Sequence, residues 1–120
     1  MVESRNTKVD LTANATWFRS FSTYGKVMVG DKAFEFYNDR NISDYVQIPW
    51  QEVTYVVADV YFHGRYIPRF EIRTRANGKF IFTTRNNKKT LRAIREYVPA
   101  NRMRQALGLW QKIKIRIMHK

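Results

Sequence analysis

Residues 70–84, FEIRTRANGKFIFTT, contain the pattern that decides how this sequence folds. Apolar and polar residues alternate on both sides of Asn77 and Gly78, which is typical of two antiparallel strands joined by a tight turn. A two-residue turn would place Phe80 on the same face as the arginines. A three-residue loop that ends in a left-handed Gly78 instead aligns four apolar side chains: Phe70, Ile72, Phe80 and Phe82. We predict the three-residue loop, because it buries two phenylalanines worth on the order of 2 kcal/mol each.

Five segments before this hairpin also have the β-branched, aromatic and alternating pattern of strands, with polar or glycine turn signals between them. Strands are therefore predicted over residues 9–18, 26–29, 33–37, 45–48, 53–62, 66–74 and 80–84. Pro49 ends the fourth strand or leaves it at a sheet edge, because its nitrogen cannot donate to a neighbouring strand. The segment from Val53 to Phe62 has the longest apolar run and should lie well inside the core.

The apolar period changes to that of a helix after Thr84. Leu91, Ile94 and Val98 recur at helical spacing, Asn86 or Asn87 can cap the first turn, and Pro99 ends the segment. A second amphipathic stripe follows at Met103, Leu107, Trp110, Ile113 and Ile117. We predict a second helix from this stripe, although the alternation over residues 112–117 fits a strand equally well.

The sequence thus predicts a mainly β fold with C-terminal helices. About seven antiparallel strands followed by a helix is the order of the pleckstrin-homology-like barrel. Residues 1–99 would form the barrel and its capping helix, and residues 100–120 would form a basic amphipathic tail packed on the same domain. A chain of 120 residues, 44% of them apolar, can bury one core. It has no cysteine, so neither disulfides nor thiolate metal sites contribute.

The net charge of +12 is concentrated in the second half of the chain. Residues 1–61 carry six basic and eight acidic residues, whereas residues 62–120 carry sixteen basic residues and only Glu71 and Glu96. This asymmetry favours an anionic partner, although a solvated basic surface would have the same composition. Residues 1–5 lack the apolar stretch of a signal peptide, and no run is long enough to span a membrane. We expect a cytoplasmic protein.

Two groups of residues are candidate binding surfaces. The first is an anionic partner-binding face on the hairpin and the start of the helix, comprising Arg69, Arg73, Arg75, Lys79, Arg85, Lys88 and Lys89. Outward arginines also protect sheet edges from pairing, so the same residues have a structural interpretation. The second is a membrane-binding or partner-binding tail, comprising Trp110, Lys112, Ile113, Lys114, Arg116 and Ile117. This stripe could equally pack on the barrel or on a second copy of the chain.

The residues needed for catalysis are sparse. The two histidines, His63 and His119, are too far apart in sequence to form a local metal-ligand pair, and no phosphate-binding glycine loop or nucleophile motif occurs. We expect no catalytic activity, no metal site and no cofactor. Trp50 follows Pro49 at the entry to a strand, and we interpret it as a core aromatic rather than a ligand-stacking residue.

Six segments spread along the chain resemble the ManO family, whose members are encoded beside mannose-type phosphotransferase transporters. They are KVDL (8–11), YGKVMVGDK (24–32), FEFY (34–37), IPWQEV (48–53), IPRF (67–70) and LRAIREYVP (91–99). The resemblance implies a pleckstrin-homology-like fold and a regulatory or accessory role for the mannose phosphotransferase system. The family supplies no catalytic residues to transfer to this sequence.

The function expected from these observations is a non-catalytic regulatory or accessory protein. It would bind a component of the mannose phosphotransferase system, either the permease or a phosphocarrier, at the inner face of the plasma membrane. The charge leaves two alternatives open: a transcriptional regulator of the mannose operon that binds nucleic acid, and a peripheral binder of anionic membranes. The apolar stripe of the tail also leaves a homo-oligomer open. A DNA-binding helix-turn-helix or zinc finger is not evident in the sequence.

Overall fold

The hairpin over residues 70–84 has the predicted register in the computed structural model, which describes residues 3–106. Phe70 pairs with Phe82 and Ile72 pairs with Phe80, so the four apolar side chains share one face. Thr74 N donates to Gly78 O at 2.8 Å, which leaves residues 75–77 as the loop. Gly78 has a φ of 73°, as the left-handed position requires. The predicted apolar face and the left-handed Gly78 are confirmed, but the three-residue loop ends one residue earlier than predicted, at Asn77.

Eight strands form one mixed sheet in the order β4-β3-β2-β1-β7-β6-β5-β8. The strands are β1 (Val9–Phe18), β2 (Ser22–Gly30), β3 (Ala33–Asn38), β4 (Tyr45–Pro49), β5 (Val53–Asp59), β6 (Phe70–Thr74), β7 (Lys79–Thr84) and β8 (Met103–Ala106). Neighbouring strands are antiparallel except β5 and β8, which are parallel. The mainly β prediction is confirmed. The sheet is open, with β4 and β8 at its edges, instead of a barrel of seven strands.

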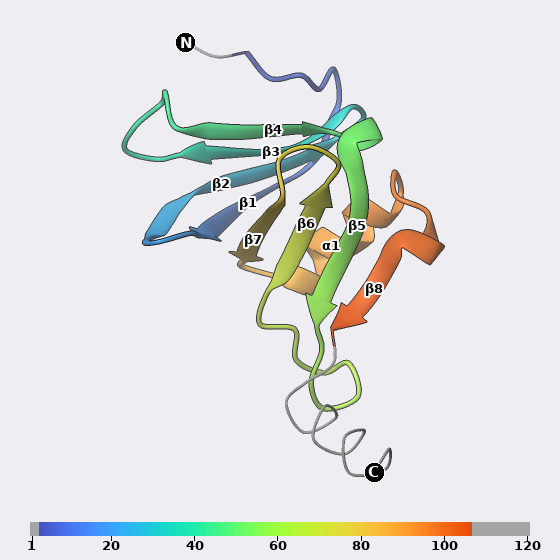
Figure 1. The fold of residues 1–120 in the computed structure, drawn as a ribbon. Helices are drawn as coiled ribbons and strands as arrows, with labels where there is room; N and C mark the ends of the chain where they lie inside the picture. The colour runs from blue at the N-terminus through green and yellow to red at the C-terminus, as the bar shows by residue number, and fades with distance from the viewer. Residues whose placement is uncertain (1–2, 107–120) are drawn as a thin grey trace.

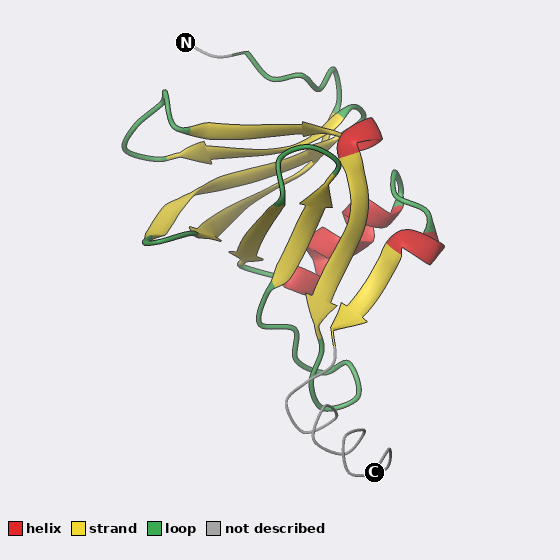
Figure 2. Ribbon diagram, in the orientation of Figure 1, coloured by secondary structure: helices red, strands yellow, loops and turns green. Residues whose placement is uncertain are grey.

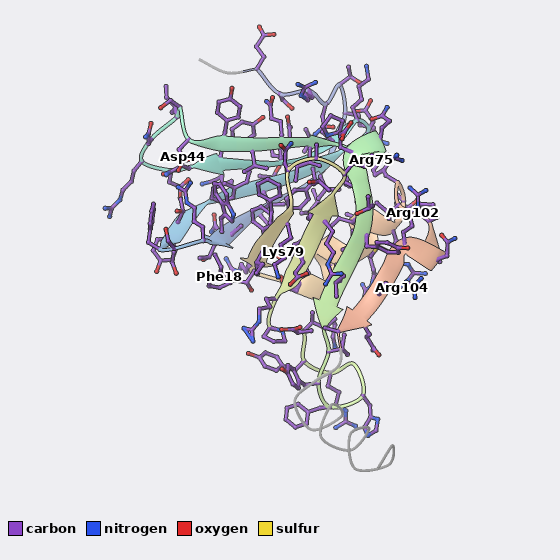
Figure 3. All side chains as sticks on the ribbon, in the orientation of Figure 1. Phe18, Asp44, Arg75, Lys79, Arg102 and Arg104 are labelled. Carbon is purple, nitrogen blue, oxygen red and sulfur yellow. The ribbon has the colours of Figure 1, made fainter. Side chains whose placement is uncertain are left out.

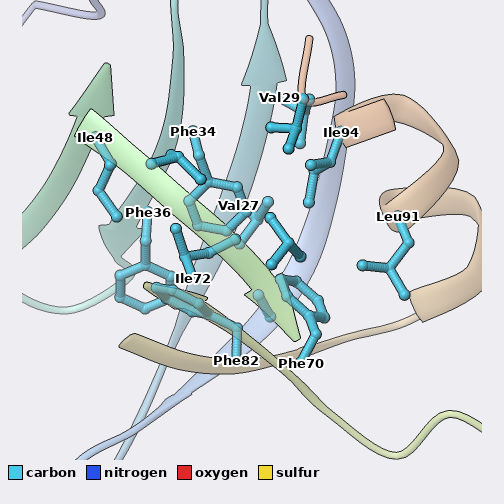
Figure 4. Packing of buried hydrophobic residues seen from close by; sticks show 14 of the residues in the cluster. Val27, Val29, Phe34, Phe36, Ile48, Phe70, Ile72, Phe82, Leu91 and Ile94 are labelled. Carbon is cyan, nitrogen blue, oxygen red and sulfur yellow. The ribbon is translucent and has the colours of Figure 1, made fainter. Parts of the chain in front are cut away.

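The sheet bends so that its two halves enclose the core (Figure 1). The chain passes from β4 to β5 through the 3-10 helix η1 (Trp50–Glu52), which carries it from one half to the other. Figure 2 shows that α1 (Asn87–Arg95) is the main helical element in the described chain. In Figure 4, side chains from both halves and from α1 point toward one another; among them are Val27, Phe34, Phe36, Ile48, Ile72, Phe82 and Ile94.

Helix α1 starts at the predicted cap. The Asn86 side chain accepts a hydrogen bond from Lys89 N at 3.1 Å, and Leu91 and Ile94 are buried against the sheet. Asn87, the first helical residue, is also buried, and its amide nitrogen donates to Ile67 O at 2.7 Å. The start of α1 is therefore fastened to the segment between β5 and β6.

The prediction of a second helix is wrong for residues 103–106. After the 3-10 helix η2 (Ala100–Arg102), the chain forms β8 and pairs with β5. Met103 lies opposite Val56 and packs against the core, while the Arg104 guanidinium lies 5.3 Å from the centre of the Tyr55 ring. Pairing with a distant strand outweighs the helical spacing of the stripe. The remaining candidate tail residues, Trp110, Lys112, Ile113, Lys114, Arg116 and Ile117, lie outside the described residues.

Two carboxylates hold the N-terminal segment against the β2–β3 region. Glu35 is fully buried and accepts hydrogen bonds from Ser4 Oγ, Arg5 N, Asn6 Nδ2 and Tyr37 Oη. Asp31 does the same for the next two residues: it accepts from Thr7 Oγ1, Thr7 N and Lys8 N. This arrangement was not predicted, because the partners are more than twenty residues apart in sequence.

The Asp31 contacts predict how stability depends on pH. Hydrogen bonds from Thr7 and Lys8 lower the pKa of Asp31 to about 2, compared with 3.8 for the unperturbed group. A group whose pKa is lower in the folded state adds stability that is complete above the unfolded pKa and is lost as the pH falls toward the folded pKa. Thermal unfolding of Asp31→Asn should therefore show a lower melting temperature than the wild type at neutral pH, with the gap narrowing between pH 3.8 and about 2. A difference in melting temperature that stays constant over this pH range would contradict a lowered pKa for Asp31.

Candidate anion-binding site

The predicted basic face divides into two groups in the structure. Arg69, Arg73, Arg75 and Lys79 lie on or beside the β6–β7 hairpin, whereas Arg85, Lys88 and Lys89 lie at the start of α1. All seven are exposed. Figure 3 shows Arg75 at the hairpin loop and Lys79 lower on the sheet.

The hairpin group is engaged by neighbouring groups of the same domain. Arg69 Nε lies 2.7 Å from Asp59 Oδ2, and this hydrogen bond raises the pKa of Arg69. Glu71 lies between two cations, 3.0 Å from Arg73 Nε and 3.8 Å from Lys79 Nζ. The Arg75 Nε donates to Gln51 O at 3.1 Å. Such exposed ion pairs add little stability, but they neutralise much of the charge on this part of the sheet.

The second group keeps its charge. Within residues 3–106, neither Arg85, Lys88 nor Lys89 forms an ion pair with a carboxylate. The fold adds two cations that the sequence analysis did not include, Lys26 from β2 and Arg65 from the β5–β6 loop. Neither is near α1 in sequence, so only the strand order could have revealed them.

A cavity of about 620 Å³ lies between β1, β2 and the start of α1. Lys26, Arg85 and Lys89 contribute to its wall, and we call these three residues with their cavity the basic cleft. Arg85 is positioned by its backbone N, which donates to Asn14 O at 3.0 Å. The positive end of the α1 dipole adds to the field in the cleft. The one carboxylate in the cavity wall, Asp10, accepts a hydrogen bond from Tyr97 Oη.

A second, smaller cavity of about 340 Å³ lies on the other side of the β7–α1 connection. Arg85 borders both cavities, and Arg65 and Lys88 complete the cationic part of this one. The remaining wall comes from the β5–β6 loop and the end of β7. The start of α1 therefore has cationic side chains and a hollow on each side, an arrangement that can bind phosphate or carboxylate groups.

Trp50 packs against the core, as predicted from the sequence. Its Nε1 donates to Gly30 O at 2.9 Å, and its ring stacks on Tyr97 with centroids 5.3 Å apart. The hydrogen bond from Tyr97 to Asp10 raises the pKa of Tyr97 to about 12. These contacts join η1 to the C-terminal end of α1.

Two further features of the described chain bear on function. Residues 3–106 contain no group of three histidine, aspartate or glutamate side chains placed to hold a metal ion. In the same residues, no helix has the length and apolar character needed to cross a membrane.

Comparison with known proteins identifies the family but assigns it no activity. The fold is similar to the crystal structure of the C-terminal domain of an unknown protein from Leishmania infantum, with a TM-score of 0.64 and 12% sequence identity. The match covers 75% of this chain and 83% of that one. No curated protein matches the sequence. A family model described as a domain of unknown function, DUF956, matches residues 1–117, and the chain belongs to this family.

Proposed function

We propose that this protein is a non-catalytic accessory protein that binds an acidic face of a mannose-type phosphotransferase component through the basic cleft. The observation that carries the proposal is the convergence on one cavity of Lys26 from β2, Arg85 from the β7–α1 connection and Lys89 from α1. The choice of partner rests on the resemblance to the ManO family. Binding to such a transporter component would place the protein in the cytoplasm, at the inner face of the plasma membrane.

The strand order supports a role in binding. The first seven strands run β4-β3-β2-β1-β7-β6-β5 and are followed by α1, which is the order expected of a pleckstrin-homology-like domain. We include that relationship in the proposal. A fold alone does not define a function, so the proposed binding rests on the charge and shape of the cleft.

The electrostatics favour an acidic protein surface. Two of the three cations in the cleft, Arg85 and Lys89, have no carboxylate partner within residues 3–106, whereas Lys26 lies 3.5 Å from Asp39. The unpaired cations raise the local potential, which accelerates association with an anionic face and disfavours other partners. Arg85 can also hold a carboxylate or a phosphorylated side chain through two parallel hydrogen bonds. A phosphorylated carrier and an acidic patch on the permease both fit this chemistry.

Charge reversal in the cleft is the test. Titration calorimetry with the purified cytoplasmic domains of a mannose-type transporter should show that Arg85→Glu/Lys89→Glu binds at least about tenfold more weakly than the wild type. Arg40→Glu/Arg102→Glu makes the same change in net charge at exposed positions outside the cleft. This control should bind nearly as well as the wild type.

Three outcomes would contradict the proposal. Equal weakening in both double variants would show that net charge, and not the cleft, drives binding. Absence of binding to every transporter component would remove the proposed partner. Sequence-specific binding to mannose-operon DNA that survives competitor DNA at physiological salt would favour a transcriptional regulator instead.

A further inference from the structure

We propose that the β5–β6 loop, residues 60–69, docks on an anionic membrane surface. Phe62 and Tyr66 would enter the headgroup region while Arg65, Arg85 and Lys88 contact lipid phosphates. This inference does not depend on the identity of the protein partner proposed above. The loop extends beyond the ends of β5 and β6, on the side of the molecule away from the N-terminus (Figure 1).

The loop is a tight, defined turn that presents two aromatic side chains to solvent. Tyr61 and Tyr66 exchange backbone hydrogen bonds of 2.8 and 3.2 Å, and Arg65 N donates to Phe62 O at 3.2 Å. Phe62 is 72% exposed and Tyr66 is 55% exposed. Aromatic residues this exposed contribute almost nothing to the core, so their presence at a projecting turn points to a partner.

The backbone conformation of the turn gives no structural reason for a phenylalanine at position 62. Phe62 has a φ of 55° and His63 a φ of 57°, which is the left-handed region that favours glycine or asparagine. A bulky residue there is strained, and neither packing nor the turn requires it. Strained backbone conformations of this kind cluster at functional sites, including ligand contacts.

The cations beside the loop supply the second half of the site. Arg65, Arg85 and Lys88 border the 340 Å³ cavity together with Tyr66. The amide of Asn87 holds the loop against α1, so the aromatic tip and the cations form one surface. The carboxylate at the end of β5, Asp59, is already paired with Arg69.

The combination of rings and cations favours a membrane over an acidic protein. Tyrosine and phenylalanine partition into the interface, and each nearby Lys or Arg adds attraction to anionic lipid. An acidic protein face would leave the projecting Phe62 ring unburied unless it also offered an apolar pocket. A lipid surface accepts a convex aromatic tip and provides phosphates at the same depth.

The tip of the β1–β2 turn provides a matched control. Phe21 is 63% exposed and Tyr24 is 68% exposed, so two rings are as accessible there as in the β5–β6 loop. One neighbouring cation, Arg19, pairs with Asp44, and its guanidinium lies 4.0 Å from the centre of the Trp17 ring and 4.7 Å from that of the Phe21 ring. The other, Arg40, borders the same hollow as Phe21 and Tyr24 and forms no ion pair within residues 3–106. Phe21 and Tyr24 thus have one unpaired cation beside them, where the β5–β6 loop has three, so they should bind anionic lipid more weakly.

Vesicle flotation with the full chain tests the proposal. The wild type should float with vesicles of phosphatidylcholine and phosphatidylglycerol, and much less with phosphatidylcholine alone. Phe62→Ser/Tyr66→Ser should reduce the partition coefficient about tenfold or more, because the apolar contribution is lost. Phe21→Ser/Tyr24→Ser should stay within about twofold of the wild type. Arg65→Gln/Lys88→Gln should weaken binding, and the remaining binding should change less with salt concentration.

A spectroscopic variant gives an independent readout. Brominated phosphatidylglycerol vesicles should quench the fluorescence of the tryptophan introduced in Phe62→Trp. They should not quench that of the tryptophan introduced in Phe21→Trp. Each of three results would overturn the proposal: no flotation of the wild type, equal flotation of the wild type and Phe62→Ser/Tyr66→Ser, or binding that is lost on removing residues 107–120 and unaffected by the loop substitutions.

Discussion

Replacing Phe82 with alanine should remove about 3–5 kcal/mol of the free energy of unfolding, the largest loss we expect from a single substitution. Phe82 is fully buried at the centre of the core (Figure 4). Its ring meets the rings of four other aromatic residues: Phe34 at 4.9 Å, Phe36 at 5.7 Å, Trp17 at 6.2 Å and Phe70 at 6.2 Å between centroids. Alanine would leave a cavity between the two halves of the sheet that these rigid rings cannot refill.

Urea unfolding followed by circular dichroism measures this loss. Phe21→Ala is the matched control: it deletes the same atoms from an exposed position and should change stability by less than about 0.5 kcal/mol. If Phe82→Ala does not fold at all, Phe82→Leu should still fold, with a smaller loss because leucine leaves a smaller cavity than alanine. A loss below about 1 kcal/mol for Phe82→Ala would mean that the two halves do not share this core.

Replacing Glu35 with alanine should cost about 2–3 kcal/mol, because hydrogen bonds to a charged group are lost and buried donors are left unsatisfied. The carboxylate is 0% exposed and accepts four hydrogen bonds. Three of these come from the N-terminal segment, so its attachment should fail with the carboxylate. Tyr37 Oη keeps one partner, because it accepts from Gln47 Nε2 at 3.0 Å.

Limited trypsin digestion separates release of this segment from global unfolding. In Glu35→Ala, cleavage after Arg5 and Lys8 should accelerate more than cleavage within β1–β7, whereas Phe82→Ala should accelerate all sites together. Glu3→Ala removes a carboxylate from an exposed position of the same segment and should leave the digestion pattern unchanged. Unchanged stability in Glu35→Ala would show that the segment contributes nothing to the fold.

Most local elements could be predicted from the sequence. The strand over residues 9–18 was predicted at the bounds of β1, and the hairpin register and the Asn86 cap were also correct. The strand predicted over residues 53–62 ends earlier, at Asp59, because the chain turns through the left-handed residues Phe62 and His63. An apolar run does not reveal where the backbone reverses.

The basic face shows where prediction from sequence becomes insufficient. Arg73 and Lys79 looked like available cations, but the β6–β7 pairing places both beside Glu71. Lys26 was not among the candidate residues predicted from the sequence, but strand order places it in the wall of the cleft with Lys89. The charge of a surface depends on which carboxylates the fold brings near it.

The sequence by itself determined the existence of β1–β7, the apolar face of the hairpin and α1, because alternation, turn residues and capping act over a few neighbouring residues. It did not give the bounds of β2, β5 and β6: the strands predicted over residues 26–29, 53–62 and 66–74 span Ser22–Gly30, Val53–Asp59 and Phe70–Thr74. Only the tertiary structure decided that Met103–Ala106 joins β5 as a parallel strand, that Glu35 holds the N-terminal segment, and that Arg65 and Arg85 border one cavity. These contacts join residues from twenty to almost fifty positions apart. Their stability comes from burial and hydrogen bonds that exist only after the sheet has bent around its core.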